Sequence, residues 1–502
     1  MSKTYKAIDT FTRLGGQKEL KTLEEGKRFF ASEAYELIPR YRKVHMAWTV
    51  MLTKQHIMSL ELAKKILGVL KPVDNSTIED MLATYDTRFP KTSLQFERYL
   101  TEEIGPEVSD INIGRTLPPP HYRMKIREAV LPLLEAVLAF RKTLLEYAEK
   151  HRNVVMPGYT HYMHAQPMTF GHYLLGLYDA VTHACLELEA AYHSINRCDM
   201  GCGALAGTSF NVDRELPAML LGFDGVLEHT NWCVAGTDMG VDLTCAMTNL
   251  MLPMSRTCTE MYTWCTFEWN MLEVSPKISE TSSMMPQKRN PCIFEEIRQI
   301  VGAVMGSYND VCARSHNTMW GDVIEVQQCQ EGMVPVIEKV IAAVKLYTKT
   351  IPEISVHQDV MLDRAAKGFS TCSELVGVLI RERNIPQRVC HGVVAEVVRI
   401  LSDSGRTAAD ITPEIIDQAA EKMLGEKLHL NADQIKAVLD PIKFVEAHTS
   451  QGGVAPTEVK RMIEQRRSEL AKAEKRHQSR LQQLADADKQ LDNAVEEILS
   501  TK

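Results

Sequence analysis

The chain has 502 residues, of which 45% are hydrophobic and 24% are charged, and its net charge is −8. This length allows about two to four domains with a large buried core, and the composition is that of a globular rather than a disordered protein. The acidic balance gives no basic footprint for nucleic acid, no apolar run reaches the roughly 20 residues of a membrane span, and the N-terminus lacks the apolar core of a signal peptide. We therefore expect no nucleic-acid or membrane partner and a cytoplasmic location.

Twelve cysteines are scattered along the chain without a C-x-x-C pair. Cys198 and Cys202 are the two closest, and no histidine pair at zinc spacing accompanies them. Several of the others lie among apolar residues in helical patterns. The pattern favours buried, reduced thiols over a metal site or disulfides.

Residues 1–116 contain helical segments that are broken by turn signals. Apolar and charged residues recur at helical spacing over residues 29–65, and Lys71-Pro72 ends a helix. Three consecutive prolines at 118–120 cannot lie inside a helix, so they mark a loop. This loop is the expected boundary between an N-terminal helical domain, residues 1–116, and the next domain.

The next region, residues 117–352, is dominated by long amphipathic runs. In the first of them an apolar stripe recurs at steps of three and four residues, formed by Ala129, Leu133, Val137, Phe140, Leu144 and Leu145. Such runs predict five long helices, over residues 124–152, 170–197, 242–273, 292–315 and 323–350. The sequence thus predicts an all-α central bundle, and apolar residues on more than one helix face predict burial against other subunits.

Residues 353–502 are expected to form a C-terminal helical domain that ends in a highly charged tail helix from residue 457. Within this tail, Leu484, Leu491 and Ile498 are seven residues apart. A short coiled coil and a solvated amphipathic helix both fit this spacing. No internal repeat, P-loop or dinucleotide-binding glycine motif is found in the chain.

Three polar loops punctuate the long helices: GRT at 114–116, GYTHYMHAQP at 158–167 and SSMMPQKRNP at 282–291. In the third, Asn290 is the expected N-cap and Pro291 the expected first residue of the following helix. Its polar groups would then lie beside a helix N-terminus, where anions are favoured. Each loop alone is weak support for a site, because a histidine in a loop is more often structural than catalytic.

Taken together, the second and third loops resemble signature loops of the fumarase/aspartase superfamily, in the branch similar to argininosuccinate lyase. Further segments match that branch: GCGALAGTSF at 201–210, DRE at 213–215, NIP at 384–386 and GGVAP at 452–456. The resemblance extends from about residue 114 to about residue 470 and is poor over the first hundred residues. It implies an all-α, three-domain fumarase/aspartase-like fold whose central long-helix bundle forms the core of a homotetramer, with each active site shared by three subunits.

Members of this family reversibly eliminate fumarate from a substituted succinate, usually by cleaving a C–N bond. The resemblance implies four catalytic residues: Ser282 as the base, His161 as general acid or charge relay, Glu295 as the carboxylate that pairs with it, and Lys288 as a stabiliser of the carbanion. Lys288 and the helix N-terminus would supply the positive potential that a serine alkoxide needs. No metal or organic cofactor is required, because the carboxylate of the substrate is the electron sink.

The resemblance also implies a set of substrate-binding residues. These are Arg115, Thr116, Thr160, Gln166, Ser283, Met285 and Asn290. His164 has no such match, and we expect it to be structural or to support the residues that touch the substrate.

Several positions depart from the family pattern. After Arg115 and Thr116 the chain continues as LPPP, where the family has an amide that binds substrate. Met319 and Ile324 stand where the family has a substrate-contacting tyrosine and glutamine, and Gln327 replaces a lysine. Further departures are DMG at 238–240 and Thr281 before the serine pair. The replacement of polar contacts by apolar side chains predicts a more apolar pocket wall. It also predicts the loss of preference for argininosuccinate, because a site built to pair polar groups of its substrate discriminates strongly against other compounds.

The sequence is therefore interpreted as a C–N lyase of amino-acid metabolism that acts on another N-substituted aspartate and releases fumarate and an amine. True argininosuccinate lyase of arginine biosynthesis is the alternative within the same chemistry. A superfamily cycloisomerase and a non-catalytic, crystallin-like protein are the alternatives from other classes. A crystallin-like protein would tolerate the loss of Ser282, His161 or Glu295, and none of them is lost.

Overall fold

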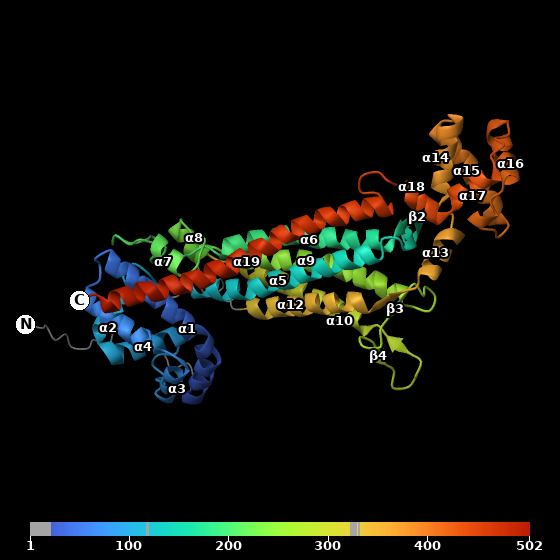
Figure 1. The fold of residues 1–502 in the computed structure, drawn as a ribbon. Coiled ribbons are helices and arrows are strands. Elements are labelled where there is room, and N and C mark those ends of the chain that lie inside the picture. The colour runs from blue at the N-terminus through green and yellow to red at the C-terminus, as the bar shows by residue number, and fades with distance from the viewer. Residues whose placement is uncertain (1–21, 117–119, 322–328, 330–331) are drawn as a thin grey trace, which may run out of the picture.

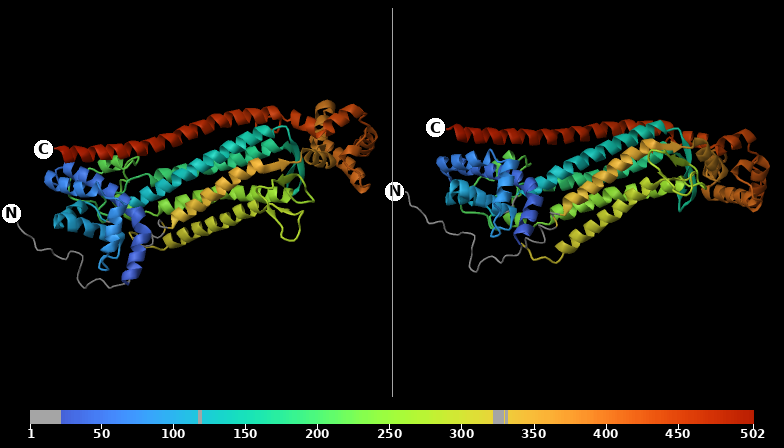
Figure 2. Two further views of the ribbon diagram at one scale, coloured as in Figure 1. Left: turned by 60° about the horizontal axis from the view of Figure 1, so that its bottom comes forward. Right: turned by 90° about the horizontal axis from the view of Figure 1, so that it is seen from below.

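A bundle of long helices forms the middle of the molecule. A group of N-terminal helices lies at one end of it and a smaller group of C-terminal helices at the other (Figures 1 and 2). The computed structural model describes residues 22–116, 120–321, 329 and 332–502. The strands of this described part form only three two-stranded sheets, β1–β2, β3–β6 and β4–β5. The predicted all-α fold class is confirmed.

The N-terminal helices enclose a hydrophobic cluster around Trp48. Helix α1 (Leu23–Lys54) begins at a capping box, in which Thr22 accepts a hydrogen bond from the backbone N–H of Glu25 and the Glu25 carboxylate accepts one from the backbone N–H of Thr22. The helices that pack around α1 in this cluster are α2 (Leu60–Leu70), α3 (Asn75–Ala83), α4 (Thr92–Ile104) and the short α7 (Glu215–Leu220).

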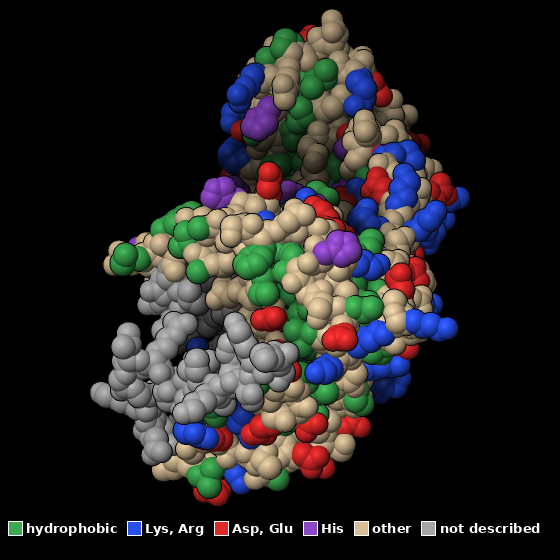
Figure 3. All heavy atoms as spheres, turned by 90° about the vertical axis from the view of Figure 1, so that its left-hand side faces the viewer, with side chains coloured by type: hydrophobic (Ala, Val, Ile, Leu, Met, Phe, Trp, Pro, Cys, Tyr) green, Lys and Arg blue, Asp and Glu red, His purple; other side chains and the backbone are tan. Residues whose placement is uncertain are grey.

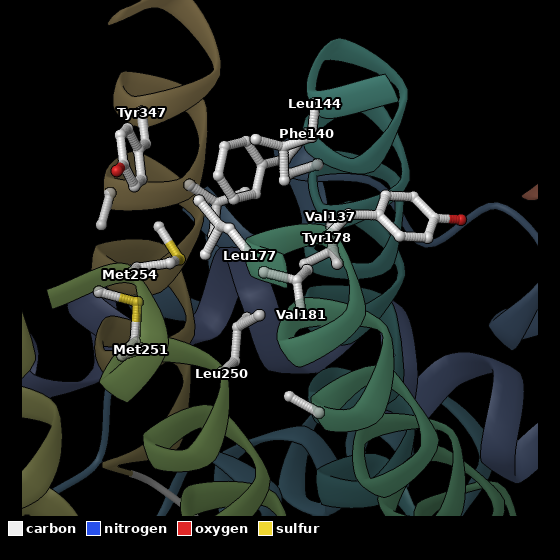
Figure 4. Close-up of a cluster of buried hydrophobic side chains, with 14 of the residues drawn as sticks. Val137, Phe140, Leu144, Leu177, Tyr178, Val181, Leu250, Met251, Met254 and Tyr347 are labelled. Carbon is white, nitrogen blue, oxygen red and sulfur yellow. The ribbon is translucent and has the colours of Figure 1, made fainter. Parts of the chain in front are cut away.

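Five long helices form the bundle within the described ranges. They are α5 (His121–Lys150), α6 (Phe170–Ile195), α9 (Asp238–Trp264), α10 (Cys292–Ser315) and α12 (Met333–Thr350). Their facing sides bury one continuous cluster, in which Phe140, Leu177, Met251 and Tyr347 come from four different helices (Figure 4). Burying each such side chain contributes about 1.5–3 kcal/mol, so the apolar stripes account for the association of these helices.

Three of the five predicted long helices coincide with α5, α6 and α10 to within a few residues. The predicted helix over residues 242–273 is wrong at its C-terminal end. There α9 stops at Trp264, the chain turns through Asn270 with a φ of 43°, and β3 (Leu272–Val274) pairs with β6 (Ile354–Val356). A short apolar run does not distinguish a helix from a strand by its period. The predicted helix over 323–350 starts in residues that the structure does not describe, and its described part is mainly α12.

The C-terminal region turns back on itself and then returns along the bundle. Helices α13 (Gln358–Lys367), α14 (Cys372–Arg383), α15 (Gln387–Asp403), α16 (Pro413–Leu424), α17 (Ala432–Leu439) and α18 (Pro441–Ala447) lie at the far end. The 45-residue helix α19 (Pro456–Ser500) then follows α5 back to the N-terminal helices. Leu491 and Ile498 are buried in the N-terminal cluster, and Leu484 packs against the bundle. The three side chains that recur every seven residues therefore pack against other helices of the same chain. The predicted domain boundaries after residues 116 and 352 stay predictions.

The described surface offers no membrane span and no cluster for a metal. No helix in it combines the length and the apolar character that crossing a membrane requires. Within the same ranges, no group of three or more His, Cys, Asp or Glu side chains is arranged to hold a metal ion. All twelve cysteines are free thiols. On the face at the N-terminal end, acidic and basic side chains are interspersed (Figure 3).

Candidate active site

The loop that carries His161 is the turn of a β-hairpin. Strands β1 (Val155–Thr160) and β2 (Met163–Thr169) follow α5 and pair antiparallel as far as Thr160 and Met163. His161 and Tyr162 are therefore a two-residue turn, and their φ values of 52° and 59° are the positive angles that a type I′ turn requires. Thr160 and His161 are exposed, and within the described part of the chain no hydrogen bond or ion pair holds the His161 imidazole.

The serine pair lies at the base of a second, smaller hairpin. Strands β4 (Glu280–Thr281) and β5 (Arg289–Asn290) pair and hold the ends of the loop over residues 282–288. The Ser282 hydroxyl oxygen accepts hydrogen bonds from the backbone N–H groups of Met284, at 3.3 Å, and Met285, at 3.0 Å. Two N–H dipoles aimed at one oxygen favour its anionic form. Ser282 is half-buried, whereas Ser283, Met285 and Lys288 are exposed.

The helix after this loop begins one residue later than predicted. Pro291, not Asn290, occupies the N-cap position of α10, and its side chain makes no capping hydrogen bond. The prediction that Asn290 caps the helix is wrong, because the Asn290 backbone pairs with Glu280 as the last residue of β5. Ser282 and Asn290 nevertheless both lie close in sequence to the first turn of α10, which carries Glu295.

Glu295 has a partner in its own chain that is not His161. It is exposed on the first turn of α10 and accepts a hydrogen bond from the hydroxyl of Tyr262 on α9, which raises the pKa of Tyr262. Arg298 lies over the same ring, with its guanidinium carbon 5.4 Å from the Tyr262 ring centroid. Sequence reasoning missed Tyr262, because only the packing of α9 on α10 brings it to Glu295.

Arg115 is buried rather than open to the surface. Its Nε donates to the carbonyl of Ile111 at 2.8 Å, and its Nη2 lies 2.5 Å from Nδ1 of His45. Burial lowers the pKa of Arg115 to about 9 and lowers that of His45, whose neutral ring can accept this hydrogen bond. The remaining Nη1 is buried and has no partner among the described residues, so it is the one donor left for a ligand. Thr116, the next residue, is exposed.

The predicted site residues lie at opposite ends of the bundle. Arg115 and Thr116 precede α5, and the β1–β2 hairpin follows it. Because α5 has 30 residues and a helix rises 1.5 Å per residue, about 45 Å of helix separates the two groups. Thr160, His161 and Gln166 lie at the end of the bundle that carries the β1–β2 hairpin. The 282–288 loop is at the same end but apart from this hairpin (Figure 1).

His164 and Gln166 face the C-terminal helices. The Nε2 of His164 is 3.4 Å from the Tyr159 hydroxyl, and the two rings meet edge to face. Burial, with the positive charge of Arg364, lowers the pKa of His164. The Gln166 amide donates to the Ser373 hydroxyl at 3.3 Å, at the start of α14. The hairpin thus connects the bundle to the C-terminal helices.

Apolar side chains gather at the N-terminal end, in the region where departures from the family pattern were found. Met319 and Trp320 are exposed, and Trp320 packs against Trp232 of α8 (Thr230–Ala235) with 5.5 Å between the ring centroids. The Trp320 indole N–H donates to the Asn231 side chain at 2.6 Å. Ile324 and Gln327, which also depart from the pattern, and the prolines at 118 and 119 lie outside the described residues.

The chain is similar to known lyases over nearly its whole length. A family model described as "Lyase" matches residues 38–306, and one described as "Argininosuccinate lyase C-terminal" matches residues 369–446. The argininosuccinate lyase of Methanosarcina acetivorans is 31% identical over 463 residues, which are 91% of each chain. Argininosuccinate lyase 1 of Shouchella clausii is 30% identical over 459 residues, 90% of this chain and 91% of the relative.

Solved structures share the fold. An EDDS lyase variant with bound fumarate superposes with a TM-score of 0.83 at 29% identity and covers 97% of both chains. The 3-carboxy-cis,cis-muconate lactonizing enzyme of Pseudomonas putida has a TM-score of 0.65 at 15% identity, over 90% of this chain and 99% of that one. At that identity the likeness concerns the fold alone.

Proposed function

From the premise that this chain belongs to the argininosuccinate lyase family of the fumarase/aspartase superfamily, and is a carbon–nitrogen lyase that forms fumarate, we propose that its substrate is an N-substituted aspartate other than argininosuccinate. The observation that carries this proposal is the apolar surface of Met319, Trp320 and Trp232. It lies where the family places polar contacts to the amine half of the substrate. EDDS lyase, similar over 97% of the chain, is itself named for another compound.

Ser282 is the base in the proposed reaction. Its alkoxide takes a proton from Cβ of the succinyl group, and the electron pair moves into the neighbouring carboxylate as an aci-carbanion. The hydrogen bonds from Met284 and Met285 support this role, because they stabilise the alkoxide. Lys288 and Asn290 bind the carboxylate where the negative charge develops, and so act more strongly on the transition state than on the substrate.

The carbanion then forms the double bond of fumarate as the C–N bond breaks. His161, protonated at the start of the cycle, gives its proton to the departing amine directly or through a relay. A carboxylate partner, Glu295, would orient this imidazole and stabilise its charge. Thr160, Gln166, Ser283 and Met285 bind the remaining groups of the substrate. Arg115 and Thr116 hold a carboxylate, and the unpartnered Nη1 of Arg115 supports that assignment.

The active form is a homotetramer in this proposal, with each site built from three subunits. Two observations support it. The residues assigned to one site are separated by the length of α5 within a chain, so they meet only if another chain lies alongside. Apolar side chains such as Leu252 on α9 and Met305 on α10 are also exposed on the isolated bundle, and association would bury them.

The proposal is tested in the synthetic direction. The enzyme is incubated with fumarate and one amine at a time from a panel of apolar amines, amino acids and arginine, and the loss of fumarate absorbance is followed, with Ser282→Ala as the control. We expect consumption with at least one apolar amine and none with arginine. Consumption with arginine alone would establish argininosuccinate lyase, the alternative that the 31% identical relatives favour. No consumption with any amine would contradict both assignments.

A further inference from the structure

A cavity lies in the middle of the molecule, between α5, α6 and α19. Its volume is about 200 Å³. Leu134 and Leu138 of α5 and Leu186 of α6 form its apolar wall, and Arg141 and His477 lie beside them. Arg141 is nine residues from the last residue of α5, which corresponds to about 14 Å of helix from the hairpin end, and farther still from the start. The cavity is therefore separate from both groups of predicted site residues.

Arg141 is a buried cation without a carboxylate partner. Its side chain is 4% exposed, its Nη2 donates to the Tyr178 hydroxyl at 3.0 Å, and it hydrogen-bonds the Cys185 thiol. Figure 4 shows the Tyr178 ring pointing away from the other labelled side chains. Nε of Arg141 is buried and has no partner, and among the described residues no carboxylate lies within ion-pair distance.

One of the two carboxylates in the cavity wall is already neutralised. Glu189 pairs with Arg480 and with Arg476, the latter at 3.5 Å, and both arginines come from α19. A buried charge without a counter-ion costs several kcal/mol, because it has lost its hydration and gained no partner. The Arg141 side chain thus has the burial and the unsatisfied donor that an anion would match.

A second unsatisfied polar atom belongs to a residue that lines the same cavity. His477 of α19 is 4% exposed, and its Nδ1 is buried without a partner. Burial lowers the pKa of His477, so the ring is neutral and one of its nitrogens can donate to an oxygen. Two unpartnered groups, from α5 and α19, therefore border one cavity, which also has an apolar wall of leucines.

We propose that this cavity is a binding site for a small monocarboxylate with an apolar body. The carboxylate pairs with the Arg141 guanidinium and accepts a hydrogen bond from His477, and the hydrocarbon part lies on Leu134, Leu138 and Leu186. A dicarboxylate fits less well, because Glu189 and the exposed Glu469 border the same cavity and only one guanidinium in it is unpaired. A cation is disfavoured by Arg141 and Arg476.

The test measures the thermal unfolding midpoint of the full-length protein against sodium butyrate, with sodium chloride at equal ionic strength as the reference. A ligand that binds only the folded state raises this midpoint with concentration. We expect a rise in the wild type and in Ser282→Ala, and none in Arg141→Met. Lys142→Met is the matched control, since it removes the same charge from the next, exposed position of α5 and should respond like the wild type.

A second variant guards against a folding defect in Arg141→Met. Ala473→Phe, from the α19 wall, fills the cavity and leaves Arg141 in place, so it should also lose the response to butyrate. An unchanged response in either variant would overturn the proposal, as would the absence of any response in the wild type. A response lost in Ser282→Ala but kept in Arg141→Met would assign the butyrate to the active site and overturn it equally.

Discussion

Ser282 is the residue with the most specific local environment in the candidate site. Its oxygen accepts two backbone hydrogen bonds. Preorganised donors of this kind cost no reorganisation during the reaction, so they stabilise a developing negative charge efficiently. Ser283 is one residue further on and has no such pair of donors within the described structure. The environment therefore distinguishes two serines that are chemically identical.

This difference predicts the behaviour of the two serine variants. Ser282→Ala should lower kcat by at least about a thousandfold, because the proposed base is lost, and it should leave the proposed homotetramer intact. Ser283→Ala, the matched control, should keep measurable turnover. Fumarate release measured at 240 nm, with oligomer mass by light scattering, checks both variants. Equal losses in the two variants would contradict the assignment of Ser282 as the base.

His121, the first residue of α5, is a buried histidine that cannot become charged easily. Neither ring nitrogen has a partner among the described residues, and the ring packs edge to face against Tyr41, with 4.7 Å between centroids. Burial lowers its pKa to about 3. Between that value and the ordinary value of 6.5 the unfolded chain binds a proton that the folded chain does not. The contribution of the neutral His121 ring to the free energy of unfolding is therefore fully present above pH 6.5, and it is lost as the pH falls toward 3.

His121→Phe should raise the free energy of unfolding at pH 7 by about 1 kcal/mol, because two unsatisfied buried polar atoms are removed. It should also make the loss of stability in acid shallower, by up to about 1.4 kcal/mol per pH unit below pH 6. Denaturant unfolding at pH 7, 6 and 5 checks this. His45 and His151, whose pKa values burial also lowers, remain in the variant and retain part of the slope. Identical pH profiles would contradict the role of His121.

At the scale of elements, the two hairpins and α19 show what a helical pattern leaves out. The β1–β2 hairpin places two non-glycine residues, His161 and Tyr162, at positive φ, which costs free energy and is typical of a functional turn. The β4–β5 pairing takes Asn290 from the expected helix cap and anchors the 282–288 loop. The buried residues of helix α19 are those that pack against other helices, and most of the rest of its surface is exposed.

The burial of α19 predicts a large difference between two of its leucines. Leu491 is 2% exposed in the N-terminal cluster, whereas Leu481, ten residues earlier, is 39% exposed. Leu491→Asp should destabilise the fold by about 3 kcal/mol or more, because it leaves a cavity and buries a charge. Leu481→Asp should cost about 0.5 kcal/mol at most. Thermal unfolding and limited proteolysis of the C-terminus check the pair, and similar midpoints for both would contradict the packing described here.

At the scale of the whole molecule, the length of the bundle decides where a site can form. Arg115 and the β1–β2 hairpin flank the same helix and cannot meet within one chain. Glu295 likewise has Tyr262 as its partner in its own chain, and the His161 turn is exposed without one. The separation of these residues and the unpartnered His161 turn are what a site shared between chains requires. They yield a prediction that does not depend on the identity of the amine.

Two inactive variants should complement each other. Ser282→Ala and His161→Asn are dissociated, mixed in equal amounts and reassociated. A site that takes its serine from one chain and its histidine from another should then regain about one quarter of wild-type turnover in a random mixture. Reassociation of each variant alone is the control and should remain inactive. No recovery, with mixed oligomers demonstrated by mass, would show that both residues come from a single chain.

The long helices could be predicted from the sequence because their apolar residues recur with the helical period over more than 20 positions. Strands β3, β4 and β5 could not, since they have only two or three residues each and such runs have no period of their own. The residue types of the candidate site were predictable from the loops GYTHYMHAQP and SSMMPQKRNP. The partners of those residues, such as Tyr262 for Glu295 and His45 for Arg115, depend on contacts between distant segments and were not.

By itself, the sequence determined the helical architecture, the order of the loops and the membership of a lyase family, because these depend on local periodicity and on residues adjacent in the chain. Only the tertiary structure decided that Ser282 accepts two backbone hydrogen bonds, that Arg115 and His161 lie at opposite ends of α5, and that Arg141 is buried without a counter-ion. The physical reason is that burial, distance and charge pairing are properties of segments brought together in space. Local patterns select the elements, and their packing decides which groups remain unpaired and open to a ligand or another chain.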